Sequence, residues 1–374
     1  MNKPIRCLIL SAAVASVAQA APFMAIGDSA ELFVTGTLAM RADDNIILAK
    51  EATSDVITDA GVGAELTFGK NSQTQGAITL RHVFTNYAEE SKYNTNLFNG
   101  DVVAKFDDGK MKLGFNAGYH ELNQNTVDVR GLIRRDVANV GANTEVGVSQ
   151  ITAAAGAVAY SRENYHPQGF VDSETVTVPL NFYYKWTPKV DLSLGYRYRD
   201  YKVNSGSALD SVDNFFSVGA RGEFSPKLTG TFAVGYTQRR YAGNAGNRGL
   251  PGVDASFAYE VSPKTSFQLS ASNDFGTSAT GLQQKNLTIN GLVTTKLNEE
   301  WSINGGLSYR GIKYDFQNTA GRTDDFWEAN LGATYVLNAN VSFVGGYTYR
   351  TFQSQLSETE FDNNVFSLAL NVRY

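Results

Sequence analysis

The chain has 374 residues, with 32 basic and 37 acidic side chains, and its formal net charge is −5. An acidic balance of this kind gives no sign of nucleic-acid binding. The composition includes 35 glycines, 19 tyrosines, 22 phenylalanines and only eight prolines, which favours a β-protein with many turns.

Residues 1–20 have the pattern of a secretory signal peptide. A basic start is followed by the apolar run 7–17, and residues 18–20 provide an A-x-A cleavage pattern. Cleavage there would remove Cys7, the only cysteine, so the mature chain 21–374 could form no disulfide. The mature part contains no apolar run long enough for a membrane-spanning helix.

Turn signals and polar loops alternate along the mature chain. Short turn signals occur at 69–73, 107–110, 187–189, 225–227, 262–264, 298–300 and 338–340, and longer polar connections include 204–213, 243–250 and 317–325. Each interval holds one alternating stretch of about twelve residues, enough for a tilted strand to cross a bilayer. The pattern predicts eighteen strands, centred near Thr37, Val62, Leu80, Val102, Phe115, Ala142, Val158, Leu180, Leu194, Val218, Phe232, Phe257, Leu269, Ile289, Leu307, Leu331, Phe343 and Leu370. It leaves the register between 121 and 150 open.

The two faces of these strands differ in polarity. In segment 190–199, one face carries Val190, Leu192, Leu194, Tyr196 and Tyr198, and the other carries Asp191, Ser193, Gly195, Arg197 and Arg199. Aromatic residues lie at the edges of the apolar face, as in a barrel whose oily band is flanked by aromatic girdles. A soluble β-sandwich shares the alternation. Many long strands, a secretion signal and a terminal aromatic instead favour an all-β, closed antiparallel transmembrane β-barrel with short periplasmic turns.

Several stretches carry a resemblance to a known family. They are "TVPLNFYYKWTPKVDLSLGYRYRDY", "SVGARGEFSPKLTGTFAVGYTQRRY", "ASNDFGTSATGLQQKN", "FWEANLGATYVLNANVSFVGGYTYR" and the terminal "NNVFSLALNVRY". The chain resembles the putative beta-barrel porin 2 family of bacterial outer-membrane proteins. The resemblance implies an outer-membrane location and an association with exopolysaccharide gene clusters, and it brings no catalytic motif.

The last strand resembles the signal that the barrel-insertion machinery reads. Its apolar face consists of Phe366, Leu368, Leu370, Val372 and Tyr374. The expected partners are therefore this machinery, outer-membrane lipid and lipopolysaccharide, with exopolysaccharide export components as a further candidate and no nucleic acid.

The polar face supplies candidate pore-lining residues. They are Arg81, Arg197, Arg199, Arg221, Arg239, Arg310 and Arg350, together with Glu223 and Glu328. One interpretation is a continuous basic strip for anionic solutes, because guanidinium groups bind carboxylate and phosphate. The other is that numerous carboxylates, among them Asp191, Glu223 and Glu328, brace the arginines against the inner wall.

These features predict a water-filled pore for small hydrophilic solutes or an exported exopolysaccharide. A structural or adhesive barrel with an occluded lumen is the alternative, and a barrel hydrolase using His120 is a third hypothesis. His82, His120 and His166 occupy separate segments, and no motif for catalysis, a metal or a cofactor is apparent. No long loop is expected to constrict the lumen; the best candidate is segment 123–136, where Arg130, Arg134 and Arg135 could enter the mouth.

Overall fold

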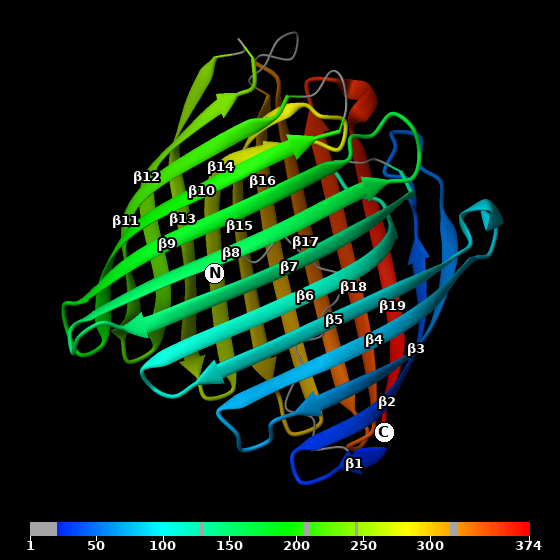
Figure 1. Cartoon of the computed structure of the whole chain (residues 1–374). Coiled ribbons are helices and arrows are strands. Elements are labelled where there is room, and N and C mark those ends of the chain that lie inside the picture. The colour runs from blue at the N-terminus through cyan, green and yellow to red at the C-terminus, as the bar shows by residue number, and fades with distance from the viewer. Residues whose placement is uncertain (1–20, 128–130, 205–208, 244–245, 315–320) are drawn as a thin grey trace.

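The computed structural model describes residues 21–127, 131–204, 209–243, 246–314 and 321–374. These residues form one closed β-barrel (Figure 1). The strands are β1 (Met24–Ile26), β2 (Ala30–Asp43), β3 (Asp55–Phe68), β4 (Thr74–Tyr87), β5 (Thr95–Asp107), β6 (Met111–Gln124), β7 (Ile133–Gly147), β8 (Thr152–Tyr165), β9 (Ser173–Lys185), β10 (Val190–Val203), β11 (Ser211–Ser225), β12 (Leu228–Tyr241), β13 (Asn247–Ser262), β14 (Thr265–Thr277), β15 (Gln283–Lys296), β16 (Trp301–Tyr314), β17 (Thr323–Val336), β18 (Val341–Ser354) and β19 (Phe361–Arg373). Two short 3₁₀ turns, η1 (Ser91–Tyr93) and η3 (Ser357–Thr359), lie in loops.

Strands β2 to β19 are the eighteen barrel strands, and every predicted strand centre lies within one of them. Each pairs antiparallel with its neighbours in the chain, and β19 pairs with β2 from Val365 opposite Asp43 to Arg373 opposite Thr35. The backbone of Tyr374 adds two hydrogen bonds to Val34, of 2.6 and 2.9 Å. The prediction of a closed antiparallel barrel is confirmed. Strand β1, which pairs with β2, was not predicted, because three residues are too few to show an alternating pattern.

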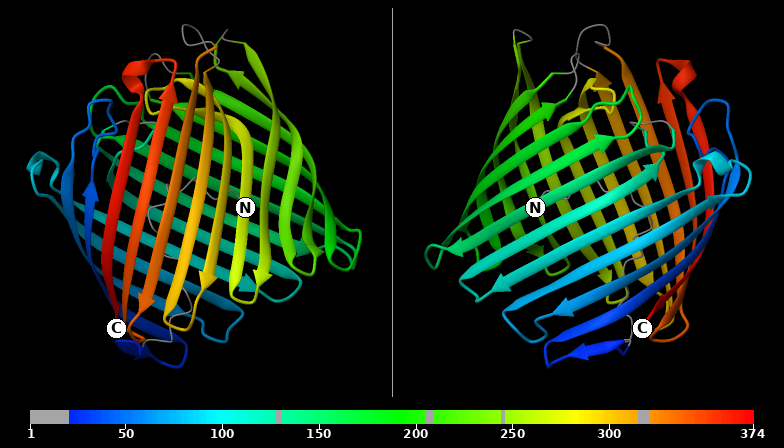
Figure 2. Two further views of the ribbon diagram at one scale, coloured as in Figure 1. Left: turned by 180° about the vertical axis from the view of Figure 1, so that it is seen from behind. Right: turned by 45° about the vertical axis from the view of Figure 1, so that its right-hand side comes forward.

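The two ends of the barrel have different connections. One end carries short turns such as 226–227 and 263–264, and the C-terminus lies at this end (Figure 2). In the turn 108–110, the Asp108 carboxylate accepts hydrogen bonds from the backbone N–H groups of Met111 and Lys110, which lowers the pKa of Asp108. The other end carries longer loops, the longest being 44–54. In outer-membrane barrels the short turns are periplasmic and the long loops extracellular.

Side chains alternate across the barrel wall as the sequence predicted. Leu194, Phe216 and Leu331 point outward and are 61, 61 and 59% exposed, whereas inward-pointing Arg197 is 9% exposed. Aromatic pairs mark both edges of the apolar surface: the rings of Trp301 and Tyr335 lie 4.8 Å apart near the turns, and those of Tyr309 and Trp327 lie 4.5 Å apart nearer the loops. This is a lipid-facing band between two aromatic girdles.

The described residues include no helix with the length and apolar character needed to cross a membrane.

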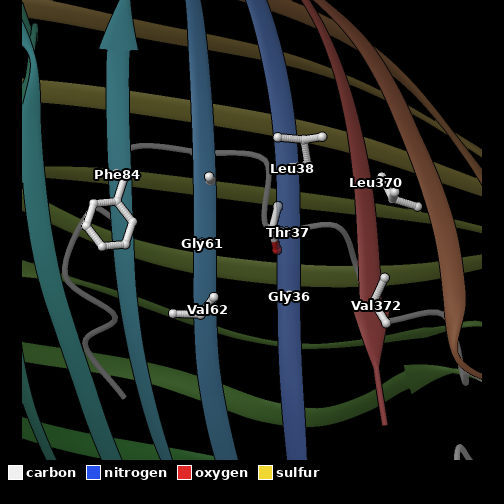
Figure 3. A pocket seen from close by; sticks show the side chains of 9 residues that line it. Gly36, Thr37, Leu38, Gly61, Val62, Phe84, Leu370 and Val372 are labelled. Carbon is white, nitrogen blue, oxygen red and sulfur yellow. The ribbon is translucent and has the colours of Figure 1, made fainter.

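A shallow apolar groove interrupts the outer surface where β19, β2, β3 and β4 lie side by side (Figure 3). Leu38, Val62 and Phe84 line it, and Gly36 leaves it open because nothing lies within 4 Å of the place where a Cβ would be. Thr37 has the opposite parity, and its hydroxyl donates to Asn371 on the inner wall at 3.1 Å. The groove therefore belongs to the lipid-facing surface and not to the lumen.

Charge placed on the outer face should destabilise the barrel. Leu194→Arg and Phe343→Arg should each cost about 2–4 kcal/mol in a lipid refolding titration, because a guanidinium would enter hydrocarbon. Ser193→Arg is the matched control: the same charge points into the lumen and should be tolerated. Equal losses in all three variants would show that the faces are assigned wrongly.

Thiol labelling should report which end of the barrel faces outward. In intact cells, a cysteine replacing Asn247 should react with a membrane-impermeant reagent because it lies at the loop end. Cysteines replacing Lys227 or Asn338, in the short turns, should be protected. The reverse labelling pattern would place the short turns outside the cell.

Candidate functional site: the lumen and its extracellular mouth

All the candidate pore-lining residues point into the barrel. Each has the parity opposite to that of the exposed apolar residues on its strand. Their partners decide whether they form a basic strip, and most of them lie beside carboxylates. These arginine–carboxylate contacts extend from the periplasmic half of the lumen to its mouth.

Arg221 of β11 crosses the inner wall to a strand four positions away. Its two Nη atoms donate to the Glu145 carboxylate of β7 at 2.7 and 2.9 Å, and its Nε donates to Asp191 at 3.0 Å. The guanidinium also lies 3.4 Å from the ring centre of Tyr183. The guanidinium extends over the Tyr183 ring of β9, and β8 beyond it presents only small luminal side chains there, Ala153, Ala155, Ala157 and Ala159. Bidentate pairing of this kind fixes both partners.

Three further arginines share three aspartates nearer the mouth. Arg197 donates to Asp254 and Asp274, both at 2.8 Å. Arg199 binds Asp274 at 3.0 Å and Asp213 at 2.8 Å. Arg239, only 2% exposed, holds both oxygens of Asp213, at 2.7 and 2.8 Å. Each guanidinium in this cluster therefore has at least one aspartate partner.

The tip of the β14–β15 hairpin leaves the barrel wall at this cluster. Pairing between β13 and β14 stops at Val253 and Asn273, whereas β14 and β15 stay paired to Thr277 and Gln283. The freed end of β14, yellow in Figure 2, curves away from β13, while β15 stays paired with β16 up to Gln284. Arg199 and Arg239 donate to the hairpin backbone at Phe275 (3.1 Å) and Gly276 (3.2 Å).

The hairpin tip also reaches the loop between β8 and β9. The Val171 N–H donates to the Ala279 carbonyl at 2.9 Å, and these residues are 7 and 6% exposed. Segment 274–283 therefore covers part of the mouth, held by guanidinium groups on one side and by a loop on the other.

A second covering segment is the loop 44–54, which folds into the barrel. Ile46 and Leu48 are 1 and 2% exposed. Leu48 packs on the inner-wall side chains Ile312, Tyr314, Phe352 and Phe361, and Ile46 packs on Ile57 and Tyr87. Asn45 fixes the loop from within, because its amide donates to the carbonyls of Ala49 (2.7 Å) and Asp362 (3.0 Å). The expectation that no loop constricts the lumen is wrong.

The segment proposed for that role, 123–136, behaves differently from the expectation. Arg134 has outward parity and lies 3.4 Å from Glu121, whereas Arg135 faces the lumen and pairs with Glu163 at 2.8 Å. Arg130 lies outside the described residues. The segment contributes to the mouth through Asn125, whose amide donates to the Ile46 carbonyl at 2.6 Å, and through Val127 and Leu132, which pack on the clusters around Leu48 and Ile46.

The remaining predicted lumen residues do not complete a basic strip. Arg350 pairs with Glu328 at 2.7 Å, as the bracing interpretation expected. Arg310 binds the amide oxygens of Asn286 and Gln284 at 3.3 and 3.2 Å. Arg81 lies far from the others, over Gly61 of β3. Glu223 binds Lys189 in the periplasmic turn, so its expected role as an arginine brace is corrected.

The three histidines lie far apart. His120 faces the lumen with its ring nitrogens 3.2 Å from Asp101 and 3.1 Å from Asn99. His82 faces outward against Phe84, and His166 lies in a loop near Asp136. Within the described ranges, no three His, Cys, Asp or Glu side chains are grouped so as to hold a metal ion.

A comparison with protein-family models identifies the family to which the chain belongs. Residues 35–374 match the model of the family described as "Putative beta-barrel porin 2". The chain belongs to this family. A porin-family barrel with an apolar exterior is a protein of the outer membrane, and the family points to a channel rather than an enzyme. No curated protein matches the sequence.

Several solved outer-membrane proteins are similar to this porin-family barrel. Pseudomonas aeruginosa OpdK with vanillate shares 9% identity over 93% of this chain and 99% of its own, with a TM-score of 0.49. Acinetobacter baumannii OccAB3 shares 10% identity over 93% of this chain and 100% of its own, with a TM-score of 0.48. The FrpB iron transporter of Neisseria meningitidis reaches a TM-score of 0.50 at 12% identity, covering 88% of this chain and 62% of its own. Identities this low concern the fold alone.

The sequence-based prediction did not identify two features of the lumen. Asp213, which binds two arginines, lies on the luminal parity of β11 and could have been found from the alternation there. The inward fold of 44–54 gave one weak signal, because Ile46 and Leu48 are apolar in a polar loop.

Removing the carboxylate of Asp274 should loosen the hairpin tip. Asp274→Asn leaves Arg197 and Arg199 short of a charged partner and should destabilise the barrel by about 3 kcal/mol. Amides 275–283 should then exchange faster with deuterium. Asp325→Asn is the control, since that carboxylate points outward and accepts a hydrogen bond from the Tyr309 hydroxyl, away from the arginine cluster. Unchanged exchange in Asp274→Asn would mean that the arginines do not hold the hairpin.

Proposed function

We propose that this porin-family barrel is a pore through which small hydrophilic solutes cross the outer membrane. The observation that carries the proposal is the exposure of the inner wall below the mouth. Val103 points into the barrel and yet is 49% exposed, so this part of the lumen has room for water. Barrels of this strand number enclose an aqueous channel.

The mouth limits what can pass. The loop 44–54 and the hairpin tip 274–283 both occupy the extracellular end, whereas no comparable inward segment is seen among the described short turns. We therefore propose a passage that is wide toward the periplasm and narrow at the cell surface. The alternative function, a structural or adhesive barrel with an occluded lumen, draws support from the same two segments.

The charges of the lumen argue against strong selection for anions. Arg197, Arg199, Arg221, Arg239 and Arg350 each have a carboxylate partner, so the arginines contribute little net positive potential. An exported exopolysaccharide remains a proposed cargo, and this pairing favours an uncharged polysaccharide over a polyanionic one.

The partners of the barrel are also proposals. The outward side chains Phe366, Leu368 and Tyr374 are 60, 60 and 58% exposed on the strand that closes the barrel. Their position suits both roles expected from the sequence: recognition by the insertion machinery before closure and contact with lipid afterwards. Lipopolysaccharide is the lipid that the extracellular girdle would meet.

Conductance in planar bilayers tests the proposal. The purified barrel should conduct, with similar permeability for chloride and potassium. Ile46→Ser combined with Leu48→Ser should raise the conductance, because the loop would lose the packing that holds it inside. Lys50→Ser is the control, since this side chain is exposed in the same loop. A barrel that conducts neither as wild type nor with the loosened loop would be the occluded alternative.

A further inference from the structure

Asparagine and glycine face each other across neighbouring strands at two places on the inner wall. The first, here called the β6–β7 plaque, consists of the pairs Gly114 with Asn143, Asn116 with Gly141, and Gly118 with Asn139. The second, the β16–β17 plaque, consists of the pairs Asn304 with Gly332 and Gly306 with Asn330. All these residues have luminal parity, because the exposed residues beside them, such as Phe115 and Leu307, point outward.

The glycines make room for the amides to lie along the wall. A Cβ on Gly332 would come within 2.7 Å of Asn304 Oδ1, and one on Gly306 within 2.7 Å of Asn330 Nδ2. The same holds in the other plaque, where a Cβ on Gly114 would lie 2.3 Å from Asn143 Oδ1. Each amide therefore rests over the backbone of the next strand. Any other residue at these glycines would push the amide away.

The amides in both plaques have unused hydrogen-bonding capacity. Considering the described residues only, the side chains of Asn143, Asn304 and Asn330 make no hydrogen bond, and Asn116 has one long contact, 3.5 Å, with Asn139. A carboxamide offers two N–H donors and a carbonyl acceptor without carrying charge. Beside the second plaque, Ser308 donates to Asn290 at 2.5 Å, which extends the uncharged polar surface.

The plaques lie on opposite walls of the lumen. Strands β8 to β15 separate them on one side, and β18, β19 and β2 to β5 separate them on the other. In Figure 1, β6 and β7 are in the near wall and β16 and β17 in the far wall. The β16–β17 plaque lies in the periplasmic half of its strands, and the β6–β7 plaque runs from the periplasmic half to the middle of its strands, below the segments that cover the mouth.

We infer that the two plaques are the solute-contacting surfaces of the pore and that their solutes are uncharged and polyhydroxylated, that is, saccharides. The inference rests on the proposed function and names the solute class. A sugar hydroxyl both donates and accepts a hydrogen bond, which matches the two functions of an amide. The plaque residues themselves carry no charge, and at the edge of the β6–β7 plaque the charges are of both signs, with Asp101 opposite Gly118 and Lys105 opposite Gly114. An ionised solute therefore finds no counter-charge on the amides themselves and no single-signed field beside them. Weak contacts on opposite walls permit release, which passage requires.

Current block by oligosaccharides tests the inference. Maltohexaose should interrupt the ion current of single wild-type channels, and an oligogalacturonate of equal length should do so less. Asn304→Leu combined with Asn330→Leu should weaken the block by maltohexaose about 3- to 10-fold for each hydrogen bond lost, with the ion conductance nearly unchanged.

Glycine variants provide a matched comparison. Gly306→Ala should also weaken the block, because its Cβ displaces the Asn330 amide. Gly305→Ala should not, since this neighbour faces outward and its Cβ would have only contacts of 3.8 and 4.0 Å. Heat-modifiable gel mobility would show which variants are folded. If Gly306→Ala does not fold, the leucine variants alone test the inference.

The outcomes distinguish the two proposals. If wild type carries no ion current, the proposed function fails, and calorimetric titration of the purified barrel with maltohexaose then decides whether the plaques bind saccharide. If the channel conducts but maltohexaose blocks no better than the oligogalacturonate, or if the leucine variants block like wild type, the inference is overturned while the pore remains.

Discussion

Everything in this barrel depends on the pairing of β19 with β2. In hydrocarbon an unpaired backbone N–H or carbonyl costs several kcal/mol, so a membrane-spanning sheet has to close. The β19–β2 ladder runs from Val365 to Arg373 and is completed by the backbone of Tyr374 bound to Val34. Closure fixes which parity faces lipid on every strand. Arginines and carboxylates can therefore be placed inside only because the same pairing places leucine and phenylalanine outside.

Inside the closed wall, side-chain size determines which charges meet. Arg221 extends over an aromatic ring of β9 and reaches Glu145 past the alanines of β8, and Arg197 reaches Asp254 across β12, where the luminal residues include Ala233 and Gly235. Such long-range pairs cross several strands of the wall. Their desolvation cost is reduced by the watery lumen, and removing one partner would still strand a charge. The arginines thus act first as braces of the wall.

The strands and faces of the barrel could be predicted from the sequence, whereas the segments that cover its mouth could not. Strand centres and faces were predicted because a period of two is a local property that any window of ten residues displays. The loop 44–54 was not, because Leu48 is buried by Ile312, Phe352 and Phe361, which lie some 260 or more positions later in the chain. The hairpin tip is similar: Asp274 on β14 meets Arg197 and Arg199 on β10 across the three strands between them. The candidate arginines could be named from parity, but their partners needed the barrel's curvature and tilt.

The asparagine–glycine pairs are a second way of placing polar side chains on the inner wall, without ion pairing. A luminal position near the periplasmic end is too far from the mouth to hold a covering segment, and a charged residue there would need a partner. An asparagine resting on a glycine needs none, keeps the passage wide and still offers hydrogen bonds to what passes. Opposite Asn304 and Asn330 stand Asn116 and Asn143, on strands far away in the sequence. The lumen thus combines a mouth covered by two segments with a lower wall in which the Arg221, Glu145 and Asp191 ion pairs lie beside uncharged asparagine–glycine patches. In the proposed pore, size is therefore tested at the mouth before a solute meets the chemistry of the lower wall.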